Sequence, residues 1–356
     1  MSSMFGNNIK LSIFGQSHAP AIGMTLDGVP AGLPVDTEKL QQFLSRRAPG
    51  QNDYSTTRRE ADVPEFLCGI VNSHTCGAPI TAIIQNANTR SSDYSQLQDQ
   101  PRPGHADYTA QIKYRGFQDY AGGGHFSGRL TAPVCIAGGL CKQWLETKNI
   151  QIHAYIKAIG SVQAASLNPV DPDFSKIDSS FPVTEVQAGI QMQKLITKAK
   201  EAGDSVGGII ECFVTGLPAG LGEPMFDGIE NKLAQIIFGV PAVKGLEFGS
   251  GFYGSTIYGS QNNDAFYMHN DKVCTKTNNA GGILGGITNG MPIIFRAAIK
   301  PTPSISQIQD TVSISKMENT QLQVKGRHDP CIVPRAVPVI EACAAIALFD
   351  FMDHEF

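Results

Sequence analysis

The chain has 356 residues, of which 42% are hydrophobic and 17% are charged, and its formal net charge is −4. This length allows one large or two ordinary globular domains, and the negative balance argues against a nucleic-acid partner, which needs a basic surface. The chain contains no apolar run of about 18 residues that could span a membrane, and it does not begin like a signal peptide. We therefore expect a cytoplasmic globular protein with no membrane partner.

Hydrophobic periodicity and turn residues predict alternating strands and helices along the chain. The polar segments 51–65 and 167–182 are expected to be a loop over a site and a surface excursion. The predicted strands are residues 9–15, 22–27, 78–85, 150–159 and 206–214, and the predicted helices are residues 36–47, 133–147, 186–202, 227–238 and 337–352.

The eight cysteines form no CxxC pair, and none has the spacing to histidine that zinc sites use. Most lie in apolar surroundings, such as Cys135 in APVCIAGGL and Cys343 in EACAAIA. We therefore predict small buried hydrophobic side chains in a reducing compartment and no metal site.

The stretch from Arg102 to Arg129 reads RPGHADYTAQIKYRGFQDYAGGGHFSGR. Its glycines permit positive φ and the close approach of a ligand to backbone N–H groups, and its basic side chains favour a phosphate or a carboxylate. Arg46 and Arg47 end the first predicted helix, where cations suit the helix dipole. The alternative to a ligand site in this stretch is a solvated loop. For Arg46 and Arg47, the alternative to ligand binding is a role at the helix dipole.

Two short motifs occur twice in the same order. GVPAGL at residues 28–33 returns as GLPAGL at 216–221, and GAPI at 77–80 returns as GMPI at 290–293. Repetition in order indicates a duplicated unit. We predict a single α+β domain over residues 1–356, a β-α-β sandwich with two pseudo-symmetric halves at approximately 9–160 and 200–350.

Histidines in turn-rich, polar contexts are the candidate acid–base groups. They include His18 in GQSH and His105 in RPGHAD, and imidazole is the natural proton donor near neutral pH, although many loop histidines are merely solvated or capping residues. Asp329, which follows His328, is a candidate to orient a base or hold a proton. The residues alone thus indicate an enzyme that acts on a small polyanion.

At these motifs the sequence closely resembles the chorismate synthase family, along nearly the whole chain. The matching segments include FGQSHAPAIG, DGVPAGL, RRAPGQ, RPGHADYT, GGGHFSGR, GLPAGLGEPMFD, NNAGGILGGITNG, KPTPSI and RHDPCIVPRAVPVIEA. The resemblance implies the β-α-β sandwich of that family and a homotetramer. It also implies anti 1,4-elimination of phosphate from 5-enolpyruvylshikimate-3-phosphate to give chorismate in the shikimate pathway, with reduced FMN as cofactor. NADPH would act only indirectly, through a separate flavin reductase or other electron donor.

The resemblance also implies roles for single residues. His18 would be the general acid toward the leaving phosphate, His105 would donate toward the N1/O2 edge of the flavin, and Asp329 would support the flavin N5 position. Ser17 and Ser127 would assist locally. The expected anion ligands are Arg47, Arg129 and Arg327. The expected FMN contacts are His125, Phe126, Ser127, Pro241, Ala242, Gly285, Lys300, Pro301, Thr302, Pro303, Ser304 and Arg327.

The chain departs from the family pattern near the expected flavin loop. The family usually reads GESHG where this chain has Gln16 and Ala19, and it carries an arginine, a serine and a glutamate where this chain has His125, Phe126 and Leu130. Altered flavin affinity or substrate preference is therefore one possibility. The rival interpretations are a flavin-binding relative that has lost turnover and a bifunctional enzyme with its own flavin reductase activity. The retained histidines, and the lack of an added domain or nucleotide fingerprint, argue against both.

Overall fold

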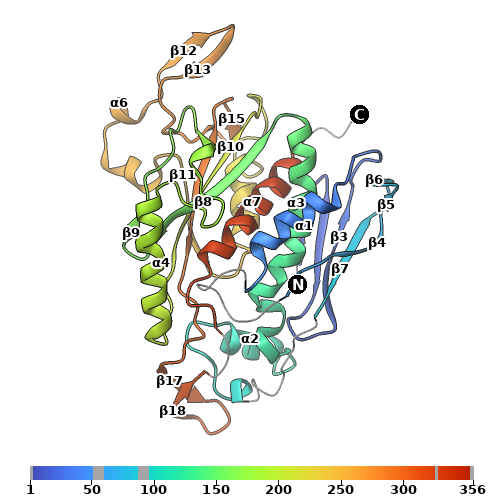
Figure 1. The fold of residues 1–356 in the computed structure, drawn as a ribbon, viewed down its shortest axis with the longest axis vertical. Helices are drawn as coiled ribbons and strands as arrows, with labels where there is room; N and C mark the ends of the chain where they lie inside the picture. Colours follow the sequence, from blue (N-terminus) through green and yellow to red (C-terminus); the bar gives the residue numbers. More distant parts are fainter. Residues whose placement is uncertain (1–2, 51–59, 87–95, 325–327, 353–356) are drawn as a thin grey trace.

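The computed structural model describes residues 3–50, 60–86, 96–324 and 328–352. It has two five-stranded antiparallel sheets with helices between them (Figure 1). The first sheet has the order β1 (Met4–Phe5), β2 (Lys10–Gly15), β3 (Ala21–Asp27), β7 (Ile80–Gln85) and β4 (Glu65–Cys68). The second has the order β11 (Val243–Phe248), β16 (Ile293–Ile299), β10 (Gly208–Thr215), β8 (Gln151–Ile159) and β9 (Val162–Gln163).

The part of the chain that the structure describes also contains seven α-helices, four two-stranded hairpins and short 3₁₀ helices at Ala121–Phe126, Gly128–Leu130, Phe174–Lys176 and Gly251–Thr256. The helices are α1 (Thr37–Arg47), α2 (Asp107–Tyr114), α3 (Thr131–Thr147), α4 (Val186–Glu201), α5 (Ile229–Ile237), α6 (Gly259–Asn262) and α7 (Val333–Phe349). The hairpins are β5 (Ile70–Val71) with β6 (His74–Thr75), β12 (Phe266–His269) with β13 (Lys272–Thr275), β14 (Ile283–Leu284) with β15 (Ile287–Thr288), and β17 (Ile308–Ser313) with β18 (Glu318–Gln323). Within the described ranges, no helix combines the length and the apolar character needed to cross a membrane.

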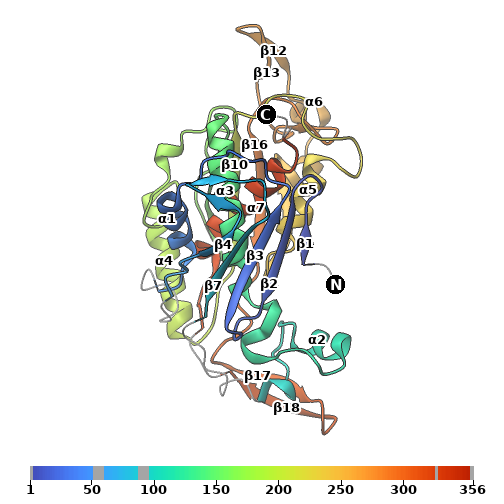
Figure 2. The same ribbon diagram turned by 90° about the vertical axis from the view of Figure 1, so that its right-hand side faces the viewer.

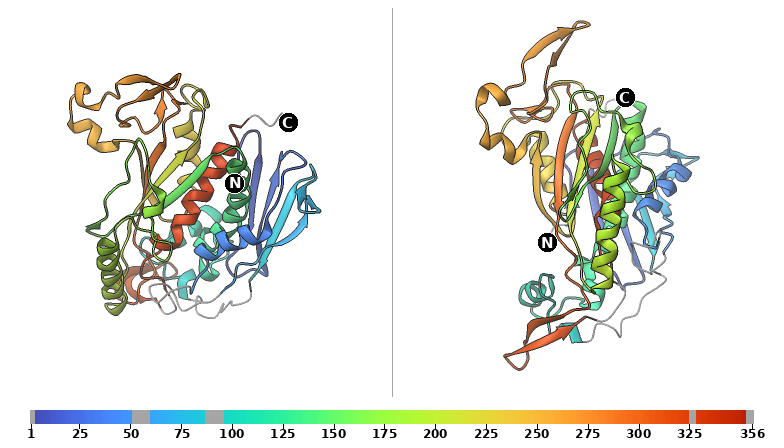
Figure 3. Two further views of the ribbon diagram at one scale, coloured as in Figure 1. Left: turned by 45° about the horizontal axis from the view of Figure 1, so that its top comes forward. Right: turned by 60° about the vertical axis from the view of Figure 1, so that its left-hand side comes forward.

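Helices α3 and α7 form the middle of the molecule. Helix α3 packs on β3 and β7 of the first sheet, α7 packs on β8 and β10 of the second, and the two helices pack on each other. Figure 2 shows the first sheet in front of these helices, and Figure 3 shows α7 between the two sheets. A Cβ on Gly138 would lie 2.3 Å from the Cβ of Ala342, so only glycine permits this approach of α3 to α7. The predicted α+β sandwich is confirmed.

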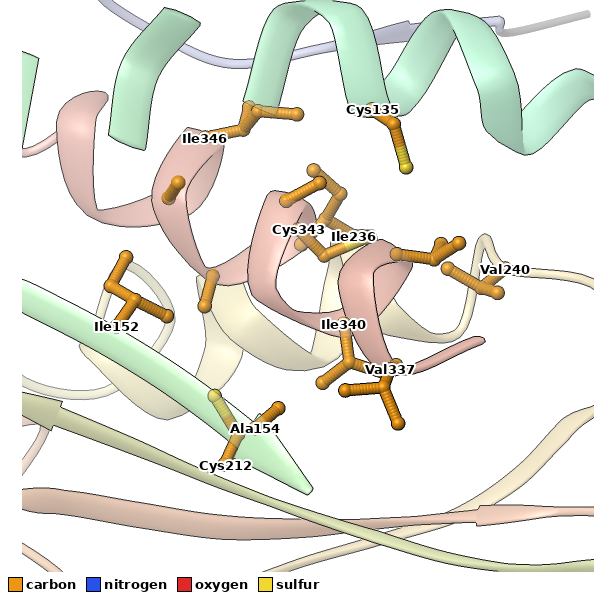
Figure 4. Close-up of a cluster of buried hydrophobic side chains, with 14 of the residues drawn as sticks. Cys135, Ile152, Ala154, Cys212, Ile236, Val240, Val337, Ile340, Cys343 and Ile346 are labelled. Carbon is orange, nitrogen blue, oxygen red and sulfur yellow. The ribbon is translucent and has the colours of Figure 1, made fainter. Parts of the chain in front are cut away.

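The core fills the space between the two sheets, around these helices, and Figure 4 shows the part where the helices meet the second sheet. Cys135 of α3, Cys343 of α7 and Cys212 of β10 are all completely buried, as are Ile152 and Ile340. Small thiol side chains fill the space between closely packed helices as a small hydrophobic residue does. All eight cysteines are free, and five of them are buried, in agreement with the predicted role for most of them.

Most predicted elements are present within a few residues of their expected ends. Helix α1 begins after Asp36, whose carboxylate accepts a hydrogen bond from Lys39 N at 2.9 Å, as its sequence predicts. Helix α7 begins at Val333 rather than at Val337. The longer helix is possible because Pro334 lies in the first turn, where the N–H that proline lacks would have no helical partner.

The turn that follows β3 of the first sheet and the turn that follows β10 of the second sheet have the same side-chain hydrogen bonds. The hydroxyl of Thr75 donates to Pro30 O at 2.6 Å and accepts from Leu33 N at 2.9 Å. The hydroxyl of Thr288 donates to Pro218 O at 2.7 Å and accepts from Leu221 N at 2.9 Å.

These turns belong to the two GxPAGL motifs, and the strands around them are connected in the same way. The order β2-β3-β7-β4 in the first sheet corresponds to β8-β10-β16-β11 in the second, and a helix, α1 or α5, follows each motif. An internal duplication would produce this arrangement. The duplication itself stays a prediction.

Candidate functional site

The triple glycine of residues 122–124 forms a tight loop beside the turn that carries Ser17 and His18. Its three φ angles are 60°, 87° and 53°, values that glycine adopts without steric cost. Ser17 N donates to Gly124 O at 3.1 Å, and the Ser17 hydroxyl donates to Ala121 O at 3.1 Å. Two segments about 100 residues apart are thereby fastened together, and Ser17 is almost fully buried.

The ring of His18 lies directly against this loop. His18 Nδ1 is 2.8 Å from the Ser17 hydroxyl oxygen, so the two side chains are joined by a hydrogen bond. A Cβ on Gly122 would lie 2.2 Å from His18 Cε1 and 2.5 Å from Ser17 Oγ. Glycine at position 122 is therefore required for the observed position of the His18 ring.

The ring of His105 lies against the next glycine. A Cβ on Gly123 would lie 3.0 Å from His105 Cε1, so successive glycines face the two predicted acid–base groups. His105 Nδ1 is 2.6 Å from a carboxylate oxygen of Asp107. Arg102 donates to both oxygens of the same carboxylate, from Nε at 2.7 Å and from Nη2 at 2.8 Å.

The predicted run from Lys300 to Ser304 packs on the turn that precedes His105. Lys300 Nζ donates to Gly104 O, and Arg102 Nη1 donates to the Ser304 hydroxyl at 3.1 Å. Pro303 lies beside Gly104. Within the same run, Pro301 packs near Gly207, and the Thr302 carbonyl accepts from the Ser205 hydroxyl at 2.7 Å.

Ala242 and Lys244 adjoin the start of this run. The carbonyl of Ala242 accepts from Lys300 N at 2.9 Å, and Ala242 has a φ of 76°, which costs energy for a residue with a side chain and is often found at functional sites. Burial and the neighbouring charge of Lys244 lower the pKa of Lys300. Two lysines whose charges repel one another suit an anion that neutralises both.

A second set of charged groups surrounds Asp62, whose side chain is fully buried. Arg47 Nη1 donates to one Asp62 oxygen at 2.6 Å, and Arg129 Nη1 donates to the other. Arg47 also donates to Thr131 Oγ1 at 3.1 Å and to Gly128 O at 3.0 Å. Burial opposes ionisation of Asp62, but the charges of Arg47 and Arg129 outweigh it and lower the pKa of Asp62.

Arg335 joins Asp329 to this cluster. It donates from Nη1 to the Asp329 carboxylate and from Nε to the carbonyl of Arg47 at 3.0 Å. The nearby Arg129 Nη2 is buried and, within the described residues, has no hydrogen-bond partner. A buried guanidinium N–H without a partner is unfavourable, and an anionic ligand oxygen would satisfy it.

Asn86 connects the arginine cluster to the turn that carries His18. Its side-chain oxygen accepts from Arg129 Nε at 3.2 Å, and its amide donates to Gln16 O at 3.1 Å and to Ala19 O at 2.7 Å. Ser127, which the sequence also singles out, accepts from Arg129 N at 3.2 Å. Both charged sets therefore border the same loop of residues 122–129.

Other predicted residues lie apart from this centre or have different neighbours. The ring nitrogens of His125 contact Gly15 O and the Ser3 hydroxyl, each at 2.8 Å. Phe126 packs against Tyr114 and lines a narrow pocket that Asp107 and Gly123 also border. Leu130, where the family carries a glutamate, is buried in the hydrophobic core.

Gly285 is separated from the rest of the predicted set. It lies in the β14–β15 hairpin, and the adjacent Gly286 accepts a hydrogen bond from Ile229 N at the start of α5. Pro241 and Ala242 follow the other end of α5, which is about 13 Å long at 1.5 Å per residue. Figure 1 shows β15 in the upper part of the molecule and α2 in the lower part. Arg327 and most of the predicted loop 51–65 lie outside the described residues.

Several residues at this centre were not assigned a role from the sequence. Asp107 is two residues after His105 in the same motif, so its spacing was a usable signal. The partners of Asp62 and Asn86, and the contact of Arg335 with Arg47, are distant in sequence, and pattern reading gives no information on such pairs. Lys244 lies in the segment VKGLEF, whose residue pattern gives no indication of a binding role.

The chain is similar to known proteins along nearly its whole length. Residues 9–352 match the family described as chorismate synthase. A chorismate synthase of Dehalococcoides mccartyi is 46% identical over 352 residues, covering 98% of this chain and 96% of that protein, and one of Korarchaeum cryptofilum is 44% identical over 347 residues with the same coverage. A crystal structure of chorismate synthase has a TM-score of 0.76 at 28% identity, covering 97% of this chain and 92% of that one. The fold is that of an α+β enzyme. The chain belongs to the chorismate synthase family, and the comparisons support chorismate synthase function.

Proposed function

We propose that this chain is a phosphate lyase that converts 5-enolpyruvylshikimate-3-phosphate to chorismate and inorganic phosphate, in aromatic amino acid biosynthesis. The elimination breaks the bond between carbon and the phosphate oxygen, removes a proton and forms a double bond, so it involves no net oxidation. The main support for this proposal is that His18 lies against Gly122 and His105 lies against the next glycine, Gly123. The loop that contains these glycines also borders the arginine cluster.

The arginines suit the anionic groups of this substrate. Arg47 and Arg129 present guanidinium groups side by side, oriented by Asp62, and planar guanidinium groups bind phosphate and carboxylate through paired N–H donors. The buried N–H of Arg129 that has no partner in the described structure is the position at which a substrate oxygen would be bound.

His18 is assigned as the general acid for the leaving phosphate. Its Nδ1 is held by the Ser17 hydroxyl, which fixes the ring plane, and Ser17 is itself held by the loop carbonyl of Ala121. A positioned imidazole contributes about 10²–10⁴-fold to a proton-transfer step. Asp329, held by Arg335, would support the flavin N5 position, the role that the family resemblance implies for it.

Reduced FMN is the proposed cofactor, and the residues present fit it. Lys300 with Lys244 would bind the phosphate, because they lie next to the pair of Val243 in β11 and Ile299 in β16. His105, Phe126 and Ser304 would contact the ring system together with the backbone of residues 301–303 and of Ala242. When bound, reduced FMN supplies an electron-rich ring that can share charge with the substrate. In a single chain, neither Gly285 nor the ring of His125 lies beside these proposed FMN contacts.

The homotetramer and the separate flavin reductase, with NADPH acting only indirectly, stay proposals that rest on the family resemblance. The cytoplasmic location stays a proposal that rests on the sequence.

The test is anaerobic turnover of 5-enolpyruvylshikimate-3-phosphate with dithionite-reduced FMN, following chorismate absorbance and phosphate release together. We expect product only with reduced flavin, and a loss of roughly a hundredfold or more in His18→Ala and in His105→Ala. His269→Ala, on the exposed β12–β13 hairpin, is the control and should keep full activity. Protein that binds FMN but forms no product would support the non-catalytic rival instead.

A further inference from the structure

The Asp107 carboxylate, beside His105, accepts four hydrogen bonds. Asp107 is the first residue of α2, and its side chain is 7% exposed. One carboxylate oxygen accepts from Arg102 Nε at 2.7 Å and from Arg102 N at 3.0 Å, and the other accepts from Arg102 Nη2 at 2.8 Å and from His105 Nδ1 at 2.6 Å. Both oxygens are thus used, and one of their partners is the imidazole.

These contacts determine which ring nitrogen of His105 carries the proton. A carboxylate can only accept, so the 2.6 Å contact requires a proton on Nδ1. Burial favours the neutral acid, but the hydrogen bonds from Arg102 and His105 outweigh it and hold the pKa of Asp107 well below its ordinary value. Arg102 Nη2, 3.1 Å from the same Nδ1, is also a donor and cannot replace the carboxylate as acceptor.

The other ring nitrogen faces the glycine loop. A Cβ on Gly123 would lie 3.1 Å from His105 Nε2, so the absence of a side chain at this position keeps space open beside that nitrogen. With Nδ1 protonated, Nε2 is the nitrogen that exchanges a proton or hydrogen bond with a ligand.

We propose that Asp107 is a positioning residue that fixes the tautomer and orientation of His105, with Arg102 bracing its carboxylate against Ser304. The part of the proposal that concerns flavin rests on the proposed function above. FMN binding and the position of His105 can be coupled through Arg102. Its Nη1 also donates to Ser304, which lies within the run of residues assigned to FMN. A ligand that moves this run would therefore act on the same carboxylate that holds His105.

The first test uses the free protein and does not depend on activity. Ring nitrogens of ¹⁵N-labelled histidine distinguish the two tautomers by NMR, and the His105 signals are assigned by their loss in His105→Gln. We expect the proton on Nδ1 in the unmodified chain. In Asp107→Asn the amide oxygen should stay with Arg102 and the amide NH₂ should face Nδ1, so the proton should move to Nε2, as an aspartate-to-asparagine change does to a catalytic histidine elsewhere.

Asp36→Asn is the matched control, because it removes the carboxylate at the start of another helix, α1, without touching His105. It should leave the His105 signals unchanged. A proton on Nε2 in the unmodified chain, or signals that Asp107→Asn does not alter, would overturn the proposal. The first of these results needs no variant, so the proposal remains testable even if Asp107→Asn does not fold.

The second test is a double-mutant cycle on turnover and on the midpoint potential of bound FMN. Asp107→Asn should lower turnover about ten- to a hundredfold, the range seen when a residue that orients a metal-binding histidine is lost, and should shift the potential. In the His105→Gln background it should do neither, because the group it orients is already absent. Equal losses in both backgrounds would show that Asp107 only supports the fold. If the unmodified chain has no turnover, the proposed function fails, and the NMR test still decides the role of Asp107.

Discussion

Arg46 and Arg47 are consecutive residues of α1, yet their guanidinium groups bind carboxylates in different parts of the molecule. Arg46 donates to Glu341 of α7 at 2.7 and 2.9 Å, and Arg47 donates to Asp62 at 2.6 Å. Successive helical side chains diverge by about 100°, so one arginine joins two helices while the other enters the proposed anion site. Their position at the end of a helix suggested a shared role at the helix dipole, and only the family resemblance singled out Arg47 as an anion ligand.

Substitution by lysine should separate these two roles. Arg47→Lys keeps a positive charge but loses the fork that reaches Asp62, Thr131 and Gly128, so we expect the KM for 5-enolpyruvylshikimate-3-phosphate to rise about tenfold or more. Arg46→Lys can still pair with Glu341 and should leave kcat and KM unchanged. Steady-state kinetics of both variants provide the measurement. Equal losses of activity would contradict the assignment of Arg47 as an anion ligand.

The glycine loop permits a test of the position of His18. Gly122→Ala adds a methyl group that would lie 2.2 Å from His18 Cε1, so the ring must move, and we expect turnover to fall roughly a hundredfold. Gly32→Ala is the control, because Gly32 also has a positive φ, of 88°, but its Cβ would meet nothing within 4 Å. It should lose stability by about 1 kcal/mol and keep its activity. Turnover and thermal unfolding of the two variants are the measurements. An equal loss of activity in both would contradict a specific effect of Gly122 on the position of His18.

Glu341 should contribute to stability in a pH-dependent way. It is buried among α1, α3 and β8, where it accepts from Arg46, from Lys142 at 3.0 Å and from Ala154 N at 3.0 Å. Burial opposes its ionisation, but Lys142 and Arg46 outweigh it and lower the pKa of Glu341 from 4.5 to about 2.

Because the folded-state pKa of Glu341 is lowered, its contribution is complete above about pH 4.5 and is lost as the pH falls toward about 2. Glu341→Gln should therefore lower the free energy of unfolding by roughly 3 kcal/mol at neutral pH, and the difference from the unmodified chain should shrink in acid. Denaturant unfolding over this pH range is the measurement, with Glu318→Gln on the exposed β17–β18 hairpin as the control. A difference that does not vary with pH would mean that Glu341 is not ionised in the folded protein.

The matching turns of the two sheets should respond alike to mutation. Thr75→Val and Thr288→Val each remove a buried hydroxyl that both donates to and accepts from the backbone, so each should cost about 1–3 kcal/mol. The two losses should add in the double variant, because the sites are in different sheets. Thr197→Val, on the exposed face of α4, should change the unfolding midpoint little. Markedly unequal losses would argue against equivalent roles for the two turns.

Local sequence rules were sufficient for much of the fold. The apolar spacing and the Asp36 cap specify α1, and the two GxPAGL motifs identify turns whose hydrogen bonds are the same. Helix α2 was not predicted, because its eight residues have only one buried side chain and no side-chain cap. Its stability comes from contacts such as that of Asp107 with Arg102, which depend on the folded turn.

The site was predicted in its residue types but not in its pairings. His18, His105 and Arg129 stand out because they lie beside glycines and prolines. Asp62 binds an arginine 67 residues away, and no local pattern indicates which carboxylate will do so. The relation between Lys244 and Lys300 likewise depends on the pairing of β11 with β16.

The cysteines in the middle of the sandwich give the folded chain a selective chemical reactivity. Burial raises the pKa of the Cys135 thiol to about 12 and that of Cys343 still further, so neither forms the reactive thiolate at neutral pH. Cys68 and Cys76, by contrast, are exposed near one edge of the first sheet. An alkylating reagent should therefore mark this edge at once, and it should reach the inner thiols only when the helix layers separate. The slow phase of labelling would report how often the two sheets come apart.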